Sequence, residues 1–432
     1  MRRDIVHEGA SQLTYEIREI VKVARQVENL GQEIFWENIG DPLQKGEKII
    51  PWIKDKVIDT VSMSSSYGYT DSQGDLDTRR FIKDEVNSRG DLTITNNDII
   101  FFNGLGDAIS KVYGFLKREA RIIGPSPAYS THSSAESAHS GYEHLTYPLD
   151  PENNWYPNLE ELENRVKYND SITGILIINP DNPTGAVYPK EILASIVDIA
   201  EKYDLFIICD ETYANVTFPN TTWTFLSSVI KKVPGISMRS LSKEVPWPGS
   251  RCGWIEVYNR NEDKEFNSYI ESIISAKRLE VCSTTQPQMV LPKILGDSRY
   301  KDHLRKRALM LSDRAGEAWD LLSKIDGIKC IKPRGGLYMT VVFDNLPGDG
   351  RLEIKNESLR LYIESLIEDV PRDKRFVYYL LASSGICVVP LSGFYSELKG
   401  FRFTLLENSD EKRDWIYKTI AQSIHDYINK LY

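Results

Sequence analysis

Short apolar runs alternate with amphipathic stretches along the middle of the chain. The runs lie at residues 98–102, 174–178, 205–209 and 235–240, and stretches with apolar residues at helical spacing include 75–89 and 189–203. Runs without polar positions indicate strands buried on both faces, and helices alternating with such strands are typical of a parallel sheet covered on both sides. We therefore predict an α/β fold here, with ligands at the carboxyl ends of the strands.

The pattern changes after residue 290. Residues 296–325 and 351–383 have the periodic pattern of helices, whereas residues 328–343 and the segments "GICVVPL" and "GFRFTLL" are predicted to be strands. Helices among few strands indicate a smaller α+β domain.

The length of 432 residues exceeds what one compact core usually holds. We predict a large domain at residues 51–295 and a small domain at residues 296–432. The N-terminal segment 1–50, which includes a helical pattern at residues 11–30, is assigned to the small domain.

Composition and charge narrow the class of protein. Hydrophobic residues make up 41% and charged residues 27%, as in an ordinary soluble globular protein, and the formal net charge of −9 argues against nucleic-acid binding. Five scattered cysteines have no metal-ligand spacing, so we expect no metal site and buried free thiols at Cys209 and Cys387. The absence of a signal peptide and of a long apolar stretch predicts a cytoplasmic protein without membrane contact.

Polar residues and glycines follow several of the predicted strands. The turn "NGLGDAI" (103–109) opens a helix and presents backbone N–H groups to a phosphate, although a tight turn without a ligand has the same pattern. Asn182 lies between Pro180 and Pro183, which restrict the backbone and hold its amide rigidly. Asp210 directly follows an apolar run; it is either an N-cap or the partner of a cation.

The segment "SMRSLSKEVPWPGSRCGW" (237–254) adds an amine and a guanidinium. Lys243 is either a surface lysine or a nucleophile that forms Schiff bases with carbonyl cofactors. Arg251, close to two glycines, is suited to a carboxylate or a phosphate. Together with Asn182 and Asp210, these residues match the needs of pyridoxal phosphate (PLP), a phosphorylated aromatic aldehyde with a ring nitrogen.

With these motifs the sequence resembles the fold-type I, class I PLP-dependent aminotransferases, from "YEIR" near residue 15 to "FRFTLL" near residue 403. It looks most like the bacterial alanine (glutamate–pyruvate) aminotransferases, which share "NPTGAVY", "KPRGxLYM" and the early Tyr-x-Ile-Arg. The resemblance implies a large domain with a mostly parallel seven-stranded sheet, a smaller α+β domain, and a homodimer with shared active sites. It also implies transamination between an L-amino acid and a 2-oxo acid, here alanine/pyruvate with glutamate/2-oxoglutarate.

The resemblance further implies the roles of individual residues. Lys243 would bind the cofactor aldehyde and move the substrate α-proton, Asp210 would pair with the ring nitrogen, and Tyr213 would donate to the phenolate oxygen together with Asn182. The remaining cofactor-binding residues would be Leu105, Gly106, Ser240 and Arg251 at the phosphate, Tyr129 on the ring face, and Tyr69 at the phosphate of the neighbouring subunit.

Substrate binding is also implied by the resemblance. Arg402 would bind the α-carboxylate with Asn182 and the backbone of Gly40, and Tyr15 and Arg18 would belong to a segment that covers the site. We expect Arg18 to pair with the distal carboxylate of glutamate, although a solvated helical arginine has the same pattern. Family members also have cis peptide bonds, expected here at Asn182–Pro183 and Ser126–Pro127.

Several alternatives stay open at this point. An aspartate or aromatic aminotransferase, or a PLP-dependent C–S lyase, would carry the same cofactor motifs, although Glu280 stands where dicarboxylate-specific enzymes place a partner-chain arginine. A transcription regulator of this fold would need an added DNA-binding domain. Pro246, Trp247 and Cys252 depart from the family pattern and leave the loop after Lys243 open.

Overall fold

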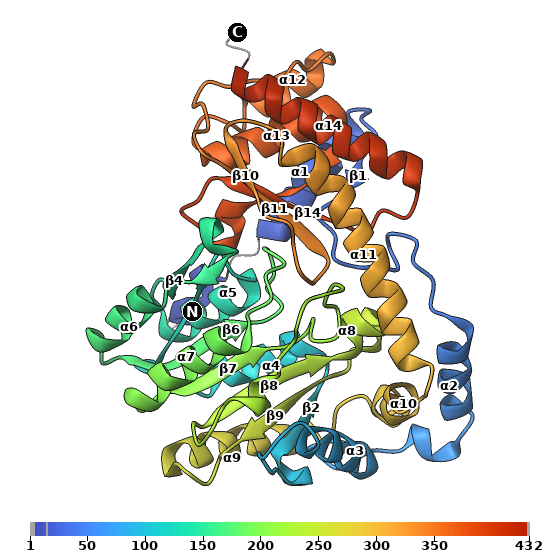
Figure 1. The fold of residues 1–432 in the computed structure, drawn as a ribbon, viewed down its shortest axis with the longest axis vertical. Helices are drawn as coiled ribbons and strands as arrows, with labels where there is room; N and C mark the ends of the chain where they lie inside the picture. Colours follow the sequence, from blue (N-terminus) through green and yellow to red (C-terminus); the bar gives the residue numbers. More distant parts are fainter. Residues whose placement is uncertain (1–4, 14–15, 430–432) are drawn as a thin grey trace.

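The computed structural model describes residues 5–13 and 16–429 (Figure 1). Its main element is an eight-stranded sheet in the order β2-β9-β8-β7-β6-β3-β4-β5. In that order the strands are Ile99–Phe102, Gly253–Tyr258, Gly235–Ser240, Phe206–Asp210, Ile172–Ile178, Arg121–Ser126, Leu145–Asp150 and Tyr156–Pro157. Only β9 and the two-residue edge strand β5 run antiparallel to their neighbours. The predicted seven-stranded, mostly parallel sheet is therefore confirmed, with β5 added at its edge.

Helices cover both faces of this sheet, which explains why its strands are apolar throughout. In β2, Phe101 packs on the side of α2, α3, α6, α7 and α10, whereas Phe102 packs on the side of α4, α5 and α9. Alternate side chains of a strand point to opposite faces, so each position needs an apolar residue. The helices are α2 (Pro51–Val61), α3 (Leu76–Asn87), α4 (Leu105–Gly114), α5 (Ser130–Ser140), α6 (Leu159–Lys167), α7 (Lys190–Lys202), α9 (Lys264–Leu279) and α10 (Thr285–Leu295).

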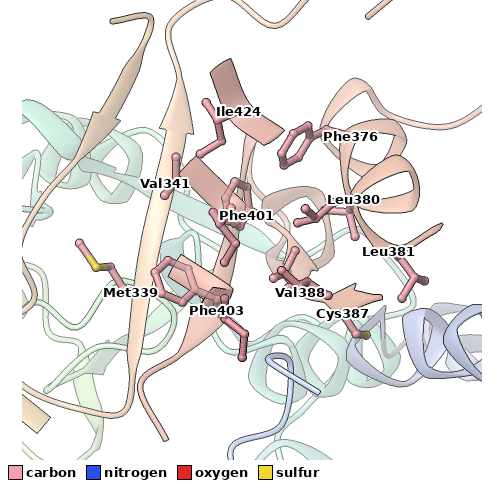
Figure 2. Close-up of a cluster of buried hydrophobic side chains, with 14 of the residues drawn as sticks. Met339, Val341, Phe376, Leu380, Leu381, Cys387, Val388, Phe401, Phe403 and Ile424 are labelled. Atoms are coloured by element: carbon pink, nitrogen blue, oxygen red, sulfur yellow. The ribbon is translucent and has the colours of Figure 1, made fainter. Parts of the chain in front are cut away.

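A second, antiparallel sheet lies beyond the carboxyl edge of the first (Figure 1). It consists of β10 (Ile328–Cys330), β11 (Tyr338–Phe343), β14 (Gly400–Thr404) and β13 (Val389–Pro390), and it packs against α12 (Glu357–Glu364), α13 (Arg372–Ser384) and α14 (Asp410–Asn429). Figure 2 shows part of this core, in which the rings of Phe376 and Phe401 stack with centroids 5.4 Å apart. The helix α1 (Glu16–Asn29) belongs to the same core through Ile20, Ala24 and Val27, and β1 (Phe35–Trp36) pairs with β12 (Ile386–Cys387).

The 23-residue helix α11 (Tyr300–Leu322) joins the two cores (Figure 1). Its buried stripe begins with Tyr300 in the core of the large sheet and continues with Leu311, Ala315, Ala318 and Leu322 in the core of the small sheet. The spacing of three and four residues places these side chains on one helical face. The remaining helical elements are α8 (Leu241–Glu244) and 3-10 turns at Glu8–Gln12, Ser64–Tyr67, Asn96–Asp98, Pro151–Asn153, Leu226–Ser228, Pro248–Ser250 and Leu391–Phe394.

One of the two expected cis peptide bonds is in place and the other is wrong. Ser126–Pro127 is cis, but the second cis bond lies at Asn179–Pro180 rather than at Asn182–Pro183, and Val245–Pro246 is also cis. The turn after β6 begins at Asn179, whose N–H donates to the carbonyl of Asp210 and whose side-chain oxygen accepts the N–H of Tyr188. These hydrogen bonds hold the backbone at the first proline of the motif, Pro180, and not at the second, Pro183.

The cysteines are free, and Cys209 and Cys387 are buried as predicted. Across residues 5–13 and 16–429 no helix is both long and apolar enough to cross a membrane. Within the same described residues no group of three or more histidine, cysteine, aspartate or glutamate side chains could hold a metal ion.

Candidate active site

A cavity of about 440 Å³ lies between the carboxyl edge of the large sheet and the small sheet. It brings together most of the residues singled out from the sequence, which come from both sheets and from the N-terminal segment. These are Arg18, Gly40, Leu105, Gly106, Tyr129, Asn182, Asp210, Tyr213, Ser240, Lys243, Arg251 and Arg402. Tyr69 does not line this cavity, and Tyr15 lies outside the described residues.

Asp210 is a buried carboxylate at the end of β7. One oxygen lies 3.1 Å from Nε2 of His132, and the other accepts the N–H (3.0 Å) and hydroxyl (2.6 Å) of Thr212. Burial by itself raises the pKa of a carboxyl, but here the hydrogen bonds and the His132 ring outweigh it, so the pKa of Asp210 lies below its usual value. When Nε2 of His132 donates, Nδ1 of the neutral ring accepts from the hydroxyl of Tyr113, 3.3 Å away. Asp210 is therefore a fixed negative charge at neutral pH.

Lys243 lies on the single turn of α8, directly after β8. Ser240 caps this turn by accepting the N–H of Ser242 (3.3 Å). The spacing Ser-x-x-Lys places Ser240 and Lys243 one helical turn apart, so both side chains reach the same cavity. The Nζ of Lys243 donates to the carbonyl of Gly40 at 2.6 Å, and the amine thus lies against the N-terminal segment.

An anion site is built at one end of the cavity. The helix α4 begins at Leu105, so the N–H groups of Leu105 and Gly106 have no partner within the helix. Arg251 lies over Gly104, where a Cβ would be 2.2 Å from its guanidinium nitrogen, and the positive φ of Gly104 (86°) also requires glycine. Together with Ser240, these donors are suited to a phosphate.

A second anion site is centred on Arg402 of β14, whose side chain is buried. Its guanidinium donates to the side-chain oxygen of Asn182 (3.0 Å) and to the carbonyl of Asn38 (2.8 Å), and it lies 3.9 Å over the ring of Tyr338. Its Nε has no hydrogen-bond partner among the described residues, and no carboxylate of that part of the chain forms an ion pair with it. A buried guanidinium without a counter-ion is suited to a ligand carboxylate.

Sequence reasoning missed several residues of this site, among them Tyr338, His132 and Asn38. The hydroxyl of Tyr338 packs against Gly40, where a Cβ would lie 1.8 Å away, so residue 40 must be glycine. Burial raises the pKa of Tyr213, whereas for Tyr338 the charges of Arg402 and Lys243 outweigh burial and lower the pKa. Only Tyr338 had a usable signal, since it opens a strand two residues after a pair of glycines.

The departures from the family pattern lie outside the cavity. Pro246, Trp247 and Cys252 are absent from its lining. Cys252 is buried, and the N–H of Trp247 donates to the carbonyl of Leu241, which folds the loop back onto α8. These residues therefore shape the support of Lys243 and not the wall that a substrate contacts.

Comparison with known proteins agrees with this geometry. The family model for aminotransferases of class I and II matches residues 34–414. An uncharacterized aminotransferase of Methanocaldococcus jannaschii is 54% identical over 99% of this chain and 100% of its own length, and the glutamate-pyruvate aminotransferase AlaA of Escherichia coli is 31% identical over 75% and 79%. The solved structure of an alanine aminotransferase from Pyrococcus furiosus superposes with a TM-score of 0.83 at 25% identity, over 96% of this chain and 98% of that one.

The chain thus belongs to the class I and II aminotransferase family and has the fold-type I architecture. Enzymes of this family and fold are generally PLP-dependent, and their substrates are amino acids and 2-oxo acids.

The carboxyl of Asp181, next to Asn182, differs from that of Asp210 in its hydrogen-bond partners and in its pKa. One oxygen accepts the N–H (3.0 Å) and hydroxyl (2.5 Å) of Thr184, while the other has no partner among the described residues. Burial raises the pKa of Asp181 to about 7, because two donors on a single oxygen do not offset it.

We expect the pH dependence of stability to reveal this carboxyl. Because the folded-state pKa of about 7 lies above the ordinary value of ~4, the protonated group stabilises the fold at low pH, and this contribution is lost between those two values. The free energy of unfolding of the wild type should therefore fall relative to that of Asp181→Asn as the pH rises from about 4 to about 7. Denaturant unfolding of both proteins at several pH values measures the difference. A difference that stays constant over this range would contradict the assignment.

Proposed function

We propose that this protein catalyses PLP-dependent transamination between an L-amino acid and a 2-oxo acid, with alanine/pyruvate and glutamate/2-oxoglutarate as its substrate pairs. The observation that carries the proposal is the convergence of three groups on one cavity: the amine of Lys243, the fixed carboxylate of Asp210, and the guanidinium of Arg402, whose Nε has no hydrogen-bond partner among the described residues. We also propose that residues 51–295 form the cofactor-binding domain and that residues 1–50 and 296–432 form the small domain.

The residues present fit PLP. The donors around Leu105, Gly106, Ser240 and Arg251 suit its phosphate, the ring of Tyr129 suits its aromatic face, and Tyr213 and Asn182 suit its phenolate oxygen. Asp210, with its lowered pKa, suits a protonated ring nitrogen. When bound, PLP supplies an aldehyde that bonds to amines and an electron-accepting ring.

The chain's own residues account for binding and proton transfer. Arg402 binds the substrate α-carboxylate, and its bonds to Asn182 and Asn38 fix the direction of its remaining N–H groups. This orients the Cα–H bond of the substrate toward Lys243. The amine of Lys243, held at the Gly40 carbonyl, moves the proton to and from the α-carbon. Asp210, a fixed negative charge, would pair with the ring nitrogen of the bound cofactor and favour its protonated form.

The choice of alanine and glutamate rests on a relative and on Arg18. The Escherichia coli relative named glutamate-pyruvate aminotransferase matches three quarters of the chain at 31% identity. A site for both substrates must bind a distal carboxylate and also accept a methyl group. Arg18, which lines the cavity and is exposed on α1, suits this need because it can turn to solvent when alanine is bound.

We expect PLP to react with Lys243. The apo-protein is saturated with PLP, reduced with borohydride and mapped by mass spectrometry, with Lys243→Ala as the control. The label should be on Lys243 and be absent from the control. An amino-donor by oxo-acid matrix on the same preparation should show turnover only when a 2-oxo acid acceptor is present. A label elsewhere, or elimination without an acceptor, would refute the proposed function.

Replacement of Arg18 should change kcat/KM for one amino donor, glutamate, and not for the other, alanine. Arg18→Ala is expected to lower kcat/KM for glutamate by about one to two orders of magnitude, because a charge-assisted contact to its distal carboxylate is lost, while alanine is spared. Lys22→Ala, an exposed cation one turn further along α1, serves as the control and should change neither value. Equal losses for both donors would remove Arg18 from the substrate site.

Tyr69 is proposed to act in the active site of a second copy. Its side chain is 86% exposed, next to Gly68, whose carbonyl accepts the hydroxyl of Thr285 (2.8 Å) at the start of α10. An exposed tyrosine on an anchored turn suits contact with a partner chain.

Subunit mixing tests this role. In a hybrid of Tyr69→Ala and Lys243→Ala chains, one site contains both intact residues if the sites are shared. An equal mixture of the two inactive variants should therefore recover about a quarter of wild-type activity, since half of the dimers are hybrids with one good site. No recovery, despite exchange verified with two affinity tags, would show that each site is built from one chain.

A further inference from the structure

The helix α11 carries two buried polar side chains at the junction of the two cores. His303 and Arg307 follow Tyr300 on the buried face, and Leu311 continues the stripe into the core of the small sheet. Buried polar groups require hydrogen-bond partners. Those of His303 and Arg307 are found in the turn that carries Lys243.

The contacts are with the backbone of that turn. Arg307 donates from one guanidinium nitrogen to the carbonyl of Lys243 at 2.7 Å and to the carbonyl of Glu244 at 3.3 Å. Nε2 of His303 lies 3.2 Å from the same Glu244 carbonyl. The last carbonyls of a helix have no partner within it, and α8 is only one turn long. Arg307 therefore supplies donors that α8 cannot supply for itself.

The other side of the Arg307 guanidinium binds the carboxylate of Glu47. Its Nε and second terminal nitrogen lie 2.6 and 3.1 Å from the two carboxylate oxygens, a bidentate ion pair. Glu47 ends the segment that begins with Asn38 and Gly40 in the cavity. This segment is linked to Lys243 at two points. Gly40 accepts a hydrogen bond from the Lys243 amine, and Glu47 pairs with Arg307, which donates to the Lys243 backbone carbonyl.

A second ion pair anchors the same turn from the sheet side. The carboxylate of Glu244 lies 3.2 Å from Arg239 of β8 and is also bonded to the side chain of Asn215. Arg239 and Glu244 belong to the large-sheet layer, and their ion pair does not involve the N-terminal segment. Arg307 thus adds, to the bond between the Lys243 amine and Gly40, a link from the backbone of the Lys243 turn to the N-terminal segment.

We propose that Arg307 is a positioning residue that sets the place of the Lys243 amine and couples it, through Glu47, to the segment 38–47. The inference rests on the proposed function, in which Lys243 is the reactive amine. Loss of Arg307 removes the donor to the Lys243 carbonyl, so that the turn can shift, and it leaves Glu47 without its partner. Because a displacement of ~1 Å can cost about a hundredfold in rate, the effect should fall on kcat rather than on KM.

The test compares Arg307→Gln and Arg307→Lys with two controls on the same helix. Arg305→Gln alters an exposed arginine that pairs with Asp302, and Leu311→Ala destabilises the same buried stripe one turn further on, away from Lys243. Each protein is measured for steady-state kcat and KM. The apo-protein is also mixed with PLP, and the rate of borohydride-trapped labelling of Lys243 is followed by mass spectrometry.

Arg307→Gln should lower kcat by about 10- to 100-fold with KM changed less than about threefold, and should slow labelling of Lys243 to a similar extent. Arg307→Lys should lie between Arg307→Gln and the wild type. Both controls should label at the wild-type rate, although Leu311→Ala unfolds at a lower temperature. If Arg307→Gln does not fold, Arg307→Lys decides the question with the same readouts.

Glu47→Gln tests the coupling. It should slow labelling less than Arg307→Gln does, and the double variant should be no slower than Arg307→Gln alone. Independent, multiplying losses would refute the coupling through Arg307. Labelling of Arg307→Gln at the rate of Leu311→Ala would refute the positioning role. A wild-type protein in which PLP does not label Lys243 would instead overturn the proposed function itself.

Discussion

The parallel direction of six strands is the constraint on which the site depends. Their carboxyl ends meet at one edge of the sheet, where the chain must turn and where backbone and side-chain polar groups gather. Asp210, Ser240 and Asn182 follow three of these strands, and Leu105 opens the helix after a fourth. Beyond these strand ends the chain leaves the sheet through a helix or a loop, so the edge needs cover from another element. The small sheet closes it from outside and contributes Arg402 and Tyr338.

Two neighbouring carboxyl groups show that burial alone does not determine whether a carboxyl in this site is ionised. Asp210 and Asp181 are both buried, yet their pKa values move in opposite directions. Asp210 has donors on both oxygens, one of them a histidine, whereas Asp181 has donors on a single oxygen. At Asp210 the bonds from Thr212 and the His132 ring outweigh the cost of desolvation, whereas at Asp181 the two bonds from Thr184 do not. The site therefore keeps one fixed negative charge beside a carboxyl that loses its proton near neutral pH.

Residues that follow apolar runs could be predicted from the sequence, since the strand end itself is the signal. This holds for Asp210 and Lys243, and for the mostly parallel sheet that carries them. Arg402 and Asn182 are 220 positions apart, and only the resemblance to a family linked them. His132 and Asn38 have no local pattern at all, because their partners come from distant segments.

The cis bond was misplaced by one proline, since hydrogen bonds to Asp210 and Tyr188 decide which proline begins the turn. The position of Tyr69 relative to a second chain is likewise beyond what one sequence specifies.

The distribution of buried arginines explains how two separate apolar cores can share one site. Apolar contacts give each core its stability but little direction at their border, because dispersion is not directional. Directional contacts across the border include those of Arg402, which bonds to Asn182 and Asn38, and those of Arg307, which bonds to Lys243 and Glu47. Backbone hydrogen bonds cross the border too, for example from the N–H of Gly336 to the carbonyl of Val216. For both arginines, one guanidinium joins the large-sheet layer to the N-terminal segment. A planar group with five donors in a fixed geometry can hold two partners at once, and a lysine cannot do so with the same precision. The relative position of the two cores, and with it the shape of the cavity, therefore depends on these directional contacts as well as on the apolar packing across the border.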